Sequence, residues 1–292
     1  MALRRELQWL ELSPVLPNFV VIGAQKSGTT SLWAYLQGHP EVYLSETKEP
    51  NFFTSDADAA RRDWYEQLFE GSTAKAVGEA STTYTMYPLA TGVPARMAAM
   101  VPGARLVYVM RHPVERMRSA YRHRLARGSD HRPIERALAE DSTYLDVSRY
   151  AMQLEQYLAH FPRSQLLLIT AEDLRDHRAA TLARVCSFID VNPAWRPTAA
   201  ALEAEHNASA GLRRPRTAPR LLGGALIRSH VVKPGGDRRP RWMDHSAMSK
   251  AISDADTSPS PSLRLHLEQQ LRPDVERLVP LMDQGFDGWG LL

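Results

Sequence analysis

The chain has 292 residues, of which 43% are hydrophobic and 24% charged, so it can bury one large globular core. Its formal net charge of +3 is too small, and its arginines are too dispersed, to indicate a nucleic-acid partner. The single cysteine, Cys186, excludes an intramolecular disulfide framework and lies in an apolar run typical of a core. We find no signal-peptide pattern and no apolar stretch of about 18 residues, so we expect a cytoplasmic protein without a membrane span.

Short apolar runs alternate with helical patterns along the chain. Strands are predicted at 19–22, 106–110 and 165–170, with weaker candidates at 41–44 and 76–79, and helices at 31–36 and from Pro113 to about Arg127. This alternation predicts an α/β fold of three α/β/α layers around a central parallel sheet. Ligands of such sheets bind beyond the carboxyl ends of the strands. Gly23 and Arg111 both follow strands directly, so we expect their loops to face one site.

The region from about 207 to 262 has a different composition. Arginine, proline, glycine and serine dominate it, which predicts long loops with at most one short helix. An amphipathic stretch at 263–282 then predicts a final helix. Without internal repeats or a clear boundary, we expect residues 1–292 to form a single domain.

The segment 23–30, GAQKSGTT, joins the first strand to its helix. Its glycines allow a tight turn, and the helix N-terminus presents unpaired amides to an anion. Lys26 adds a positive charge, and hydroxyl donors follow in Thr29, Thr30 and Ser31. The nucleoside-triphosphate loop instead has its lysine directly after the second glycine. The early lysine, with no metal-binding aspartate at the next strand end, favours a phosphosulfate over a magnesium-bound triphosphate. A plain glycine turn is the alternative.

Two segments carry a family resemblance. The sequence AQKSGTTSL at 24–32 is similar to the 5′-phosphosulfate-binding loop of the sulfotransferase superfamily, and RHPVERMRSAY at 111–121 resembles its 3′-phosphate-binding segment. The similarity is greatest to the heparan sulfate N- and O-sulfotransferases and their bacterial relatives. It implies a P-loop-like nucleotide-binding fold, 3′-phosphoadenosine 5′-phosphosulfate (PAPS) as the donor, no metal, and a hydroxyl or amine of a carbohydrate or small natural product as the acceptor. The donor-binding residues that it implies are Lys26, Ser27, Gly28, Thr29, Thr30, Ser31, Arg111 and Ser119.

The segment TKEPNFF at 47–53 resembles the family stretch whose glutamate deprotonates the acceptor. The resemblance implies Glu49 as the base, Lys48 as a second cation at the sulfuryl group, and Lys26 as the stabiliser of the leaving phosphate. A solvated loop glutamate is the alternative for Glu49, and His112 is a rival base. The chain departs from the family at Asn51, where several relatives have histidine, and at Ala80, where heparan-type enzymes have lysine. The second departure weakens the case for a polyanionic acceptor.

The loop 206–216 contains three arginines. A Lys/Arg-Gly loop near this position closes over the 3′-phosphate in the family, which implies that role for Arg213 and Arg214. A solvated charged surface is the alternative. Two other functions stay open for the chain. One is a P-loop-type kinase or NTPase, and the other is a non-catalytic nucleotide-binding or partner-binding protein.

Overall fold

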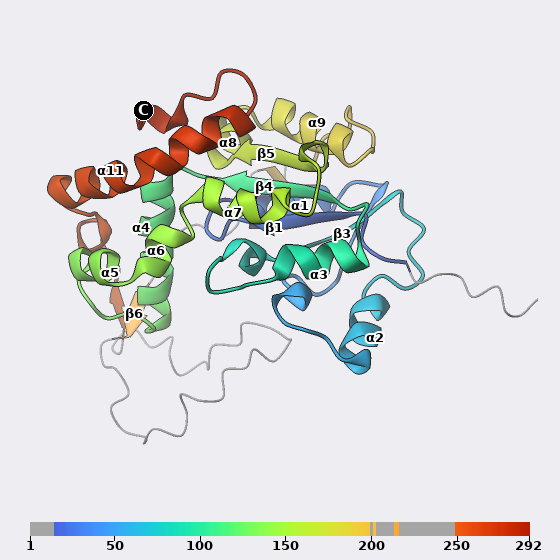
Figure 1. The fold of residues 1–292 in the computed structure, drawn as a ribbon, viewed down its shortest axis with the longest axis horizontal. Coiled ribbons are helices and arrows are strands. Elements are labelled where there is room, and N and C mark those ends of the chain that lie inside the picture. The colour runs from blue at the N-terminus through green and yellow to red at the C-terminus, as the bar shows by residue number, and fades with distance from the viewer. Residues whose placement is uncertain (1–14, 199–200, 203–212, 216–248) are drawn as a thin grey trace, which may run out of the picture.

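The computed structural model describes residues 15–198, 201–202, 213–215 and 249–292. At its centre lies a five-stranded sheet in the order β2-β3-β1-β4-β5, in which every neighbouring pair is parallel (Figure 1). The strands are β1 Phe19–Gly23, β2 Val42–Leu44, β3 Ala76–Ala80, β4 Arg105–Met110 and β5 Leu166–Thr170. All five predicted strands are confirmed.

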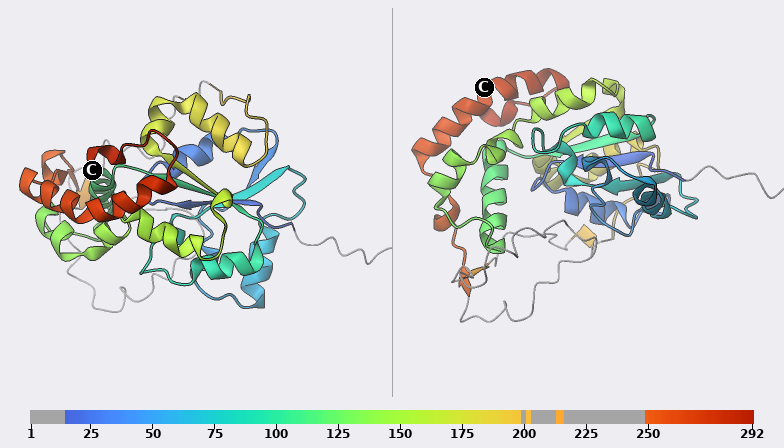
Figure 2. Two further views of the ribbon diagram at one scale, coloured as in Figure 1. Left: turned by 45° about the horizontal axis from the view of Figure 1, so that its top comes forward. Right: turned by 60° about the horizontal axis from the view of Figure 1, so that its bottom comes forward.

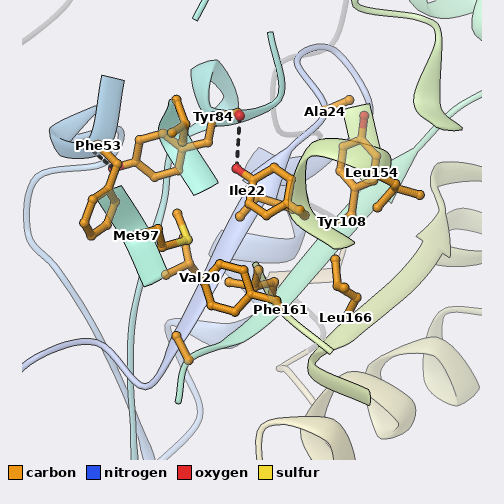
Figure 3. Close-up of a cluster of buried hydrophobic side chains, with 14 of the residues drawn as sticks. Val20, Ile22, Ala24, Phe53, Tyr84, Met97, Tyr108, Leu154, Phe161 and Leu166 are labelled. Atoms are coloured by element: carbon orange, nitrogen blue, oxygen red, sulfur yellow. Dashed lines mark hydrogen bonds between the residues drawn. The ribbon is translucent and has the colours of Figure 1, made fainter. Parts of the chain in front are cut away.

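Side chains of each buried strand alternate between two hydrophobic cores, because successive residues of a strand point to opposite faces. In β1, Val20 and Ile22 join the first core, whereas Phe19 and Val21 join the second. The first core packs under α2 (Ala59–Gln67), α3 (Val93–Met100) and α7 (Tyr150–Leu158), and the second under α1 (Thr29–Leu36), α8 (Ala171–Asp176) and α9 (Arg178–Phe188). Figure 2 shows these helices on opposite sides of the sheet, and Figure 3 shows part of the first core. The predicted three-layer fold is confirmed.

A third hydrophobic cluster lies beside the sheet, where α4 (Pro113–Arg127) packs against the last long helix. That helix, α11 (Pro261–Leu278), continues into a short 3-10 turn, Val279–Leu281. The short helices α5 (Ile134–Glu140) and α6 (Ser142–Asp146) complete the cluster. The predicted helices at 113–127 and 263–282 are confirmed, and Cys186 is buried in α9 as expected.

The region 207–262 is described only in part. Its strand β6 (Arg213–Pro215) pairs antiparallel with β7 (Ser249–Ala251), and β6 lies against α4. After β7, the carboxylate of Asp254 contacts Arg118 and Arg122 of α4. These ion pairs hold the end of the region on the helix. Among the described residues, no helix is both long and apolar enough to cross a bilayer.

Candidate active site

The loop between β1 and α1 requires glycine at two positions. Gly23 has φ of +151°, and a Cβ there would lie 2.0 Å from Thr85 Oγ1, so no side chain fits. Gly28, with φ of +92°, precedes α1, and no side chain caps the helix. The first amides of a helix have no partner within the helix, so those of α1 can face a ligand. Ser27 and Thr29 are buried, whereas Gly28 is exposed.

Lys26 stands in this loop with a left-handed backbone, φ 69°. Its ammonium is half-buried and forms no ion pair with any carboxylate of the described residues. Burial lowers the pKa of Lys26, and the positive charge of Arg111, followed by that of Arg127, lowers it further. Glu49 opposes the shift, and Lys48 adds weakly to it. The loop therefore concentrates positive charge around a desolvated ammonium, an arrangement that a bound anion would stabilise.

The predicted base lies at this loop. The Lys48 ammonium is 3.2 Å from Glu49 Oε1 and donates a hydrogen bond to Thr30 Oγ1, also at 3.2 Å. Thr82 donates a second hydrogen bond to Glu49 Oε1 at 3.3 Å. The other carboxylate oxygen of Glu49 has no hydrogen bond within the described part of the chain. One oxygen is thus held by two donors, and the second can accept a proton.

Glu49 reaches this position through backbone pairing with the neighbouring strand. Its amide donates to the carbonyl of Ala80 at the end of β3, at 3.0 Å. Both Glu49 and Asn51 have left-handed backbones, with φ of 61° and 52°. Such conformations are rare for residues other than glycine and persist where the surrounding structure enforces them. They are typical of functional sites.

The second predicted phosphate segment begins at the end of β4. The Tyr150 hydroxyl donates to the Arg111 carbonyl at 2.7 Å and so ties this strand end to α7. The Arg111 guanidinium has no ion pair or hydrogen bond with a described residue. Ser119 is buried on α4. The rival base, His112, packs near Trp289, with ring centroids 6.4 Å apart, and its amide donates to Glu172.

The structure therefore brings together most of the residues that the sequence singled out. One edge of the sheet carries Lys26, Thr30, Lys48 and Glu49. The positive charge of Arg111 also acts there, because it lowers the pKa of the Lys26 ammonium. Ser31 is half-buried near the start of α1. The backbones of Arg213 and Arg214 form β6, but their side chains lie outside the described residues, so their predicted role is not tested.

Three residues of the site have no local signal in the sequence. Arg127 is the last residue of α4, and Tyr150 and Thr82 come from two further elements. A basic residue at a helix end or a tyrosine in an amphipathic helix is ordinary on its own. Their proximity to the loops follows from tertiary packing. The described residues contain no group of three potential metal ligands. A metal-free reaction stays a prediction.

A parallel α/β sheet with a glycine-bounded strand-to-helix loop and an arginine at the end of the adjacent strand is typical of the P-loop-like class of folds. The family model of the sulfotransferase domain matches residues 16–206, more than half of the chain. The chain therefore belongs to the sulfotransferase family, as the resemblance predicted.

Known relatives support this assignment. The Homo sapiens bifunctional heparan sulfate N-deacetylase/N-sulfotransferase 2 is 28% identical over 201 residues, covering 61% of this chain and 22% of that protein. The Homo sapiens heparan sulfate glucosamine 3-O-sulfotransferase 3A1 is 31% identical over 188 residues, covering 61% of this chain and 45% of that protein. The matched segment thus spans less than half of either relative. The crystal structure of a sulfotransferase from Alicyclobacillus acidocaldarius superposes with a TM-score of 0.67 and 25% identity, covering 94% of this chain and 99% of that one.

Proposed function

We propose that this chain transfers a sulfuryl group from PAPS to a hydroxyl or amine of a carbohydrate or small natural product. One observation carries the proposal: the Lys48 ammonium lies 3.2 Å from both Glu49 Oε1 and Thr30 Oγ1. It joins the loop suited to the donor's phosphosulfate to the carboxylate suited to the acceptor's proton. Sulfuryl transfer requires these two functions side by side.

The residues present fit such a donor at two places. Lys26, Thr30 and the first amides of α1 would hold the 5′-phosphosulfate, and Arg111 would hold the 3′-phosphate together with Ser119. Neither Lys26 nor Arg111 is paired with a described carboxylate, so both cations can bind an anion without breaking an ion pair. We propose that Arg213 and Arg214 close over the 3′-phosphate. The position of β6 against α4, which carries Ser119, supports this role.

The bound donor would supply an electrophilic sulfur and a phosphate leaving group. Glu49 would accept the proton of the acceptor hydroxyl while the acceptor oxygen bonds to sulfur and the sulfur–oxygen bond to the phosphate breaks. Lys26 would neutralise the charge that develops on the leaving phosphate oxygen, and Lys48 would stabilise the sulfuryl oxygens. The products are the sulfated acceptor and adenosine 3′,5′-bisphosphate.

The acceptor class follows less directly. The named relatives act on heparan sulfate, which makes carbohydrates the first acceptors to test. The side chain of Ala80, where heparan-type enzymes carry lysine, is buried in the second core and offers no charge to an acceptor. We therefore propose an acceptor that is less anionic than heparan sulfate around its reacting group.

The test is a transfer screen with labelled PAPS against polyanionic and neutral oligosaccharides and small natural products. We expect wild-type turnover with at least one acceptor and almost none with Lys26→Ala or Glu49→Ala. Matched controls are Glu46→Ala, an exposed carboxylate of the same loop, and Lys75→Ala, whose ammonium pairs with Asp190 on the surface. Both should retain full turnover.

Calorimetry separates the alternatives. We expect adenosine 3′,5′-bisphosphate to bind without magnesium. Failure to bind it, together with tight magnesium-linked ATP binding, would instead indicate a P-loop kinase or NTPase. Binding of the bisphosphate without transfer to any acceptor would indicate a non-catalytic nucleotide-binding protein.

A further inference from the structure

A carboxylate is buried behind the proposed base, at the end of β3. Glu79 has no exposed surface, and three hydroxyl groups donate to it. Its Oε1 accepts from Tyr65 at 2.9 Å and from Tyr84 at 2.7 Å, and its Oε2 accepts from Ser81 at 2.7 Å. A fully buried carboxylate is costly unless its hydrogen bonds are satisfied. A residue of this kind, outside the reacting groups, requires an explanation.

Two of these hydroxyls also accept hydrogen bonds from backbone amides of the segment that follows the proposed base. Ser81 Oγ accepts from the amide of Asn51 at 3.0 Å, and the Tyr84 hydroxyl accepts from that of Phe53 at 3.4 Å. A hydroxyl has one proton, so its donation to Glu79 turns its lone pairs toward other donors. An ionised Glu79 therefore orients both hydroxyls as acceptors for the loop.

The carbonyls of the same segment are held from the other side. Arg61 donates to the carbonyls of Asn51 and Phe52 at 3.0 and 2.9 Å, and Arg96 donates to that of Phe53 at 2.8 Å. The Asn51 side chain donates in turn to the Glu49 carbonyl at 2.7 Å. These bonds enforce the left-handed backbones of Glu49 and Asn51, which cost about 1–3 kcal/mol each when unsupported.

We propose that Glu79 is a positioning residue, which fixes the Glu49 carboxylate for proton transfer by orienting the Ser81 and Tyr84 hydroxyls under the loop. The inference rests on the proposed function, in which Glu49 is the base. Glu79 itself touches neither reactant. Its part is to hold the loop rigidly, because a displacement of about 1 Å at a catalytic group can lower turnover about 100-fold.

The titration of Glu79 provides a distinctive readout. The ionisable groups that face it are Tyr65 from α2, Tyr84, Tyr157 from α7, and Glu49. Burial raises the pKa of Glu79 to about 7, against the hydrogen bonds of its hydroxyl donors. Protonation would place a donor on a group that now only accepts, and one hydroxyl would have to turn away from the loop. Turnover should therefore fall as the pH decreases through about 7.

The test compares wild type with Glu79→Gln and Ser81→Ala. We expect both variants to lower kcat by about 10- to 100-fold with KM for the donor nearly unchanged. Their double variant should lose little more than Glu79→Gln alone, because Ser81 is one of the two hydroxyls through which Glu79 acts. The wild-type decline of kcat below about pH 7 should be absent in Glu79→Gln. Tyr43→Phe, which removes a tyrosine hydroxyl bonded to the Leu68 carbonyl, is the control and should leave kcat unchanged.

Hydrogen exchange gives a readout that needs no turnover. The amides of Asn51 and Phe53 should exchange at least about tenfold faster in Glu79→Gln than in wild type, while amides of β1 stay protected. Unchanged exchange and wild-type kcat in both variants would overturn the positioning role. Faster exchange in a protein that transfers no sulfuryl group would refute the proposed function but not the structural link.

Discussion

Two loops meet at the carboxyl edge of the sheet and are held by different means. The donor loop, between β1 and α1, takes its shape from Gly23 and Gly28, and the Lys26 ammonium has no partner among the described residues. The base loop, 45–53 after β2, is held by hydrogen bonds from Ser81, directly after β3, and from Arg61 of α2 and Arg96 of α3. One loop keeps its cation available, and the other has its backbone polar groups satisfied.

The difference corresponds to the two tasks that we propose for the loops. A donor with several charged oxygens is bound by amides and cations that tolerate small displacements. A base must meet one proton within hydrogen-bond reach, so its carboxylate requires a rigid support. Changes in the donor loop should therefore affect binding and turnover together, whereas a change at Glu49 should affect turnover alone.

The largest effect is expected at the base. Glu49→Gln retains the hydrogen bonds of the side chain but removes its capacity to accept a proton. We expect kcat to fall by about 10²–10⁴-fold, the range for removal of a general base. Calorimetry should show unchanged affinity for adenosine 3′,5′-bisphosphate. Retained turnover would show that the base lies elsewhere, with His112 the next candidate.

The next effect is expected at the donor loop. Lys26→Ala removes the cation that we propose lies opposite the leaving phosphate, and we expect kcat to fall by about 10²–10³-fold. In contrast to Glu49→Gln, bisphosphate affinity should fall as well. Lys26→Arg restores the charge without the compact geometry and should recover part of the binding but little of the turnover. Equal bisphosphate affinity in wild type and Lys26→Ala would contradict the distinction between the two loops.

A smaller effect should separate the two phosphate positions. Arg111→Ala should weaken adenosine 3′,5′-bisphosphate binding by about 10- to 100-fold, the cost of a charged hydrogen-bonded contact. Adenosine 5′-phosphate, which lacks the 3′-phosphate, should bind wild type and variant about equally. An equal loss for both ligands in titration calorimetry would place Arg111 at the 5′ side instead.

The smallest effect concerns stability and pH. The pKa of Glu79 is about 7 in the folded chain, above its ordinary value of 4.5, so the folded state binds this proton more tightly than the unfolded state. Its contribution to the free energy of unfolding is therefore complete at low pH and is lost as the pH rises to about 7. Relative to Glu79→Gln, wild type should lose on the order of 1 kcal/mol per pH unit in that window. The free energy of unfolding would be measured for both proteins by denaturation at several pH values. The same pH dependence in wild type and Glu79→Gln would exclude this titration.

Local patterns predicted much of the fold. Continuous apolar runs mark β1 and β4 as buried strands, and Pro113 marks the start of α4, because a missing amide costs nothing in the first turn. The patterns identify no helix at α2 or α3, which are short. The sequence of α2, AARRDWYEQ, buries only Tyr65. A helix with one buried residue has no apolar stripe to detect, and packing against the sheet stabilises it.

The residues of the site also differ in how far the sequence predicts them. Lys26 and its glycines could be predicted because every necessary residue lies within one strand-to-helix turn. Nothing in the sequence indicates that Glu79 is a buried anion, since its donors Tyr65 and Tyr84 come from separate elements. A glutamate in a weak strand candidate is ordinarily exposed.

The sequence by itself determined the parallel α/β architecture, the glycine-bounded strand-to-helix loop and the family, because apolar runs and a tight turn depend on neighbouring residues. Only the tertiary structure decided that Lys48 bridges Thr30 and Glu49, and that the buried carboxylate of Glu79 accepts from Ser81, which in turn accepts from the amide of Asn51. The physical reason is that the energies of a buried charge and of a left-handed backbone depend on partners supplied by other strands and helices.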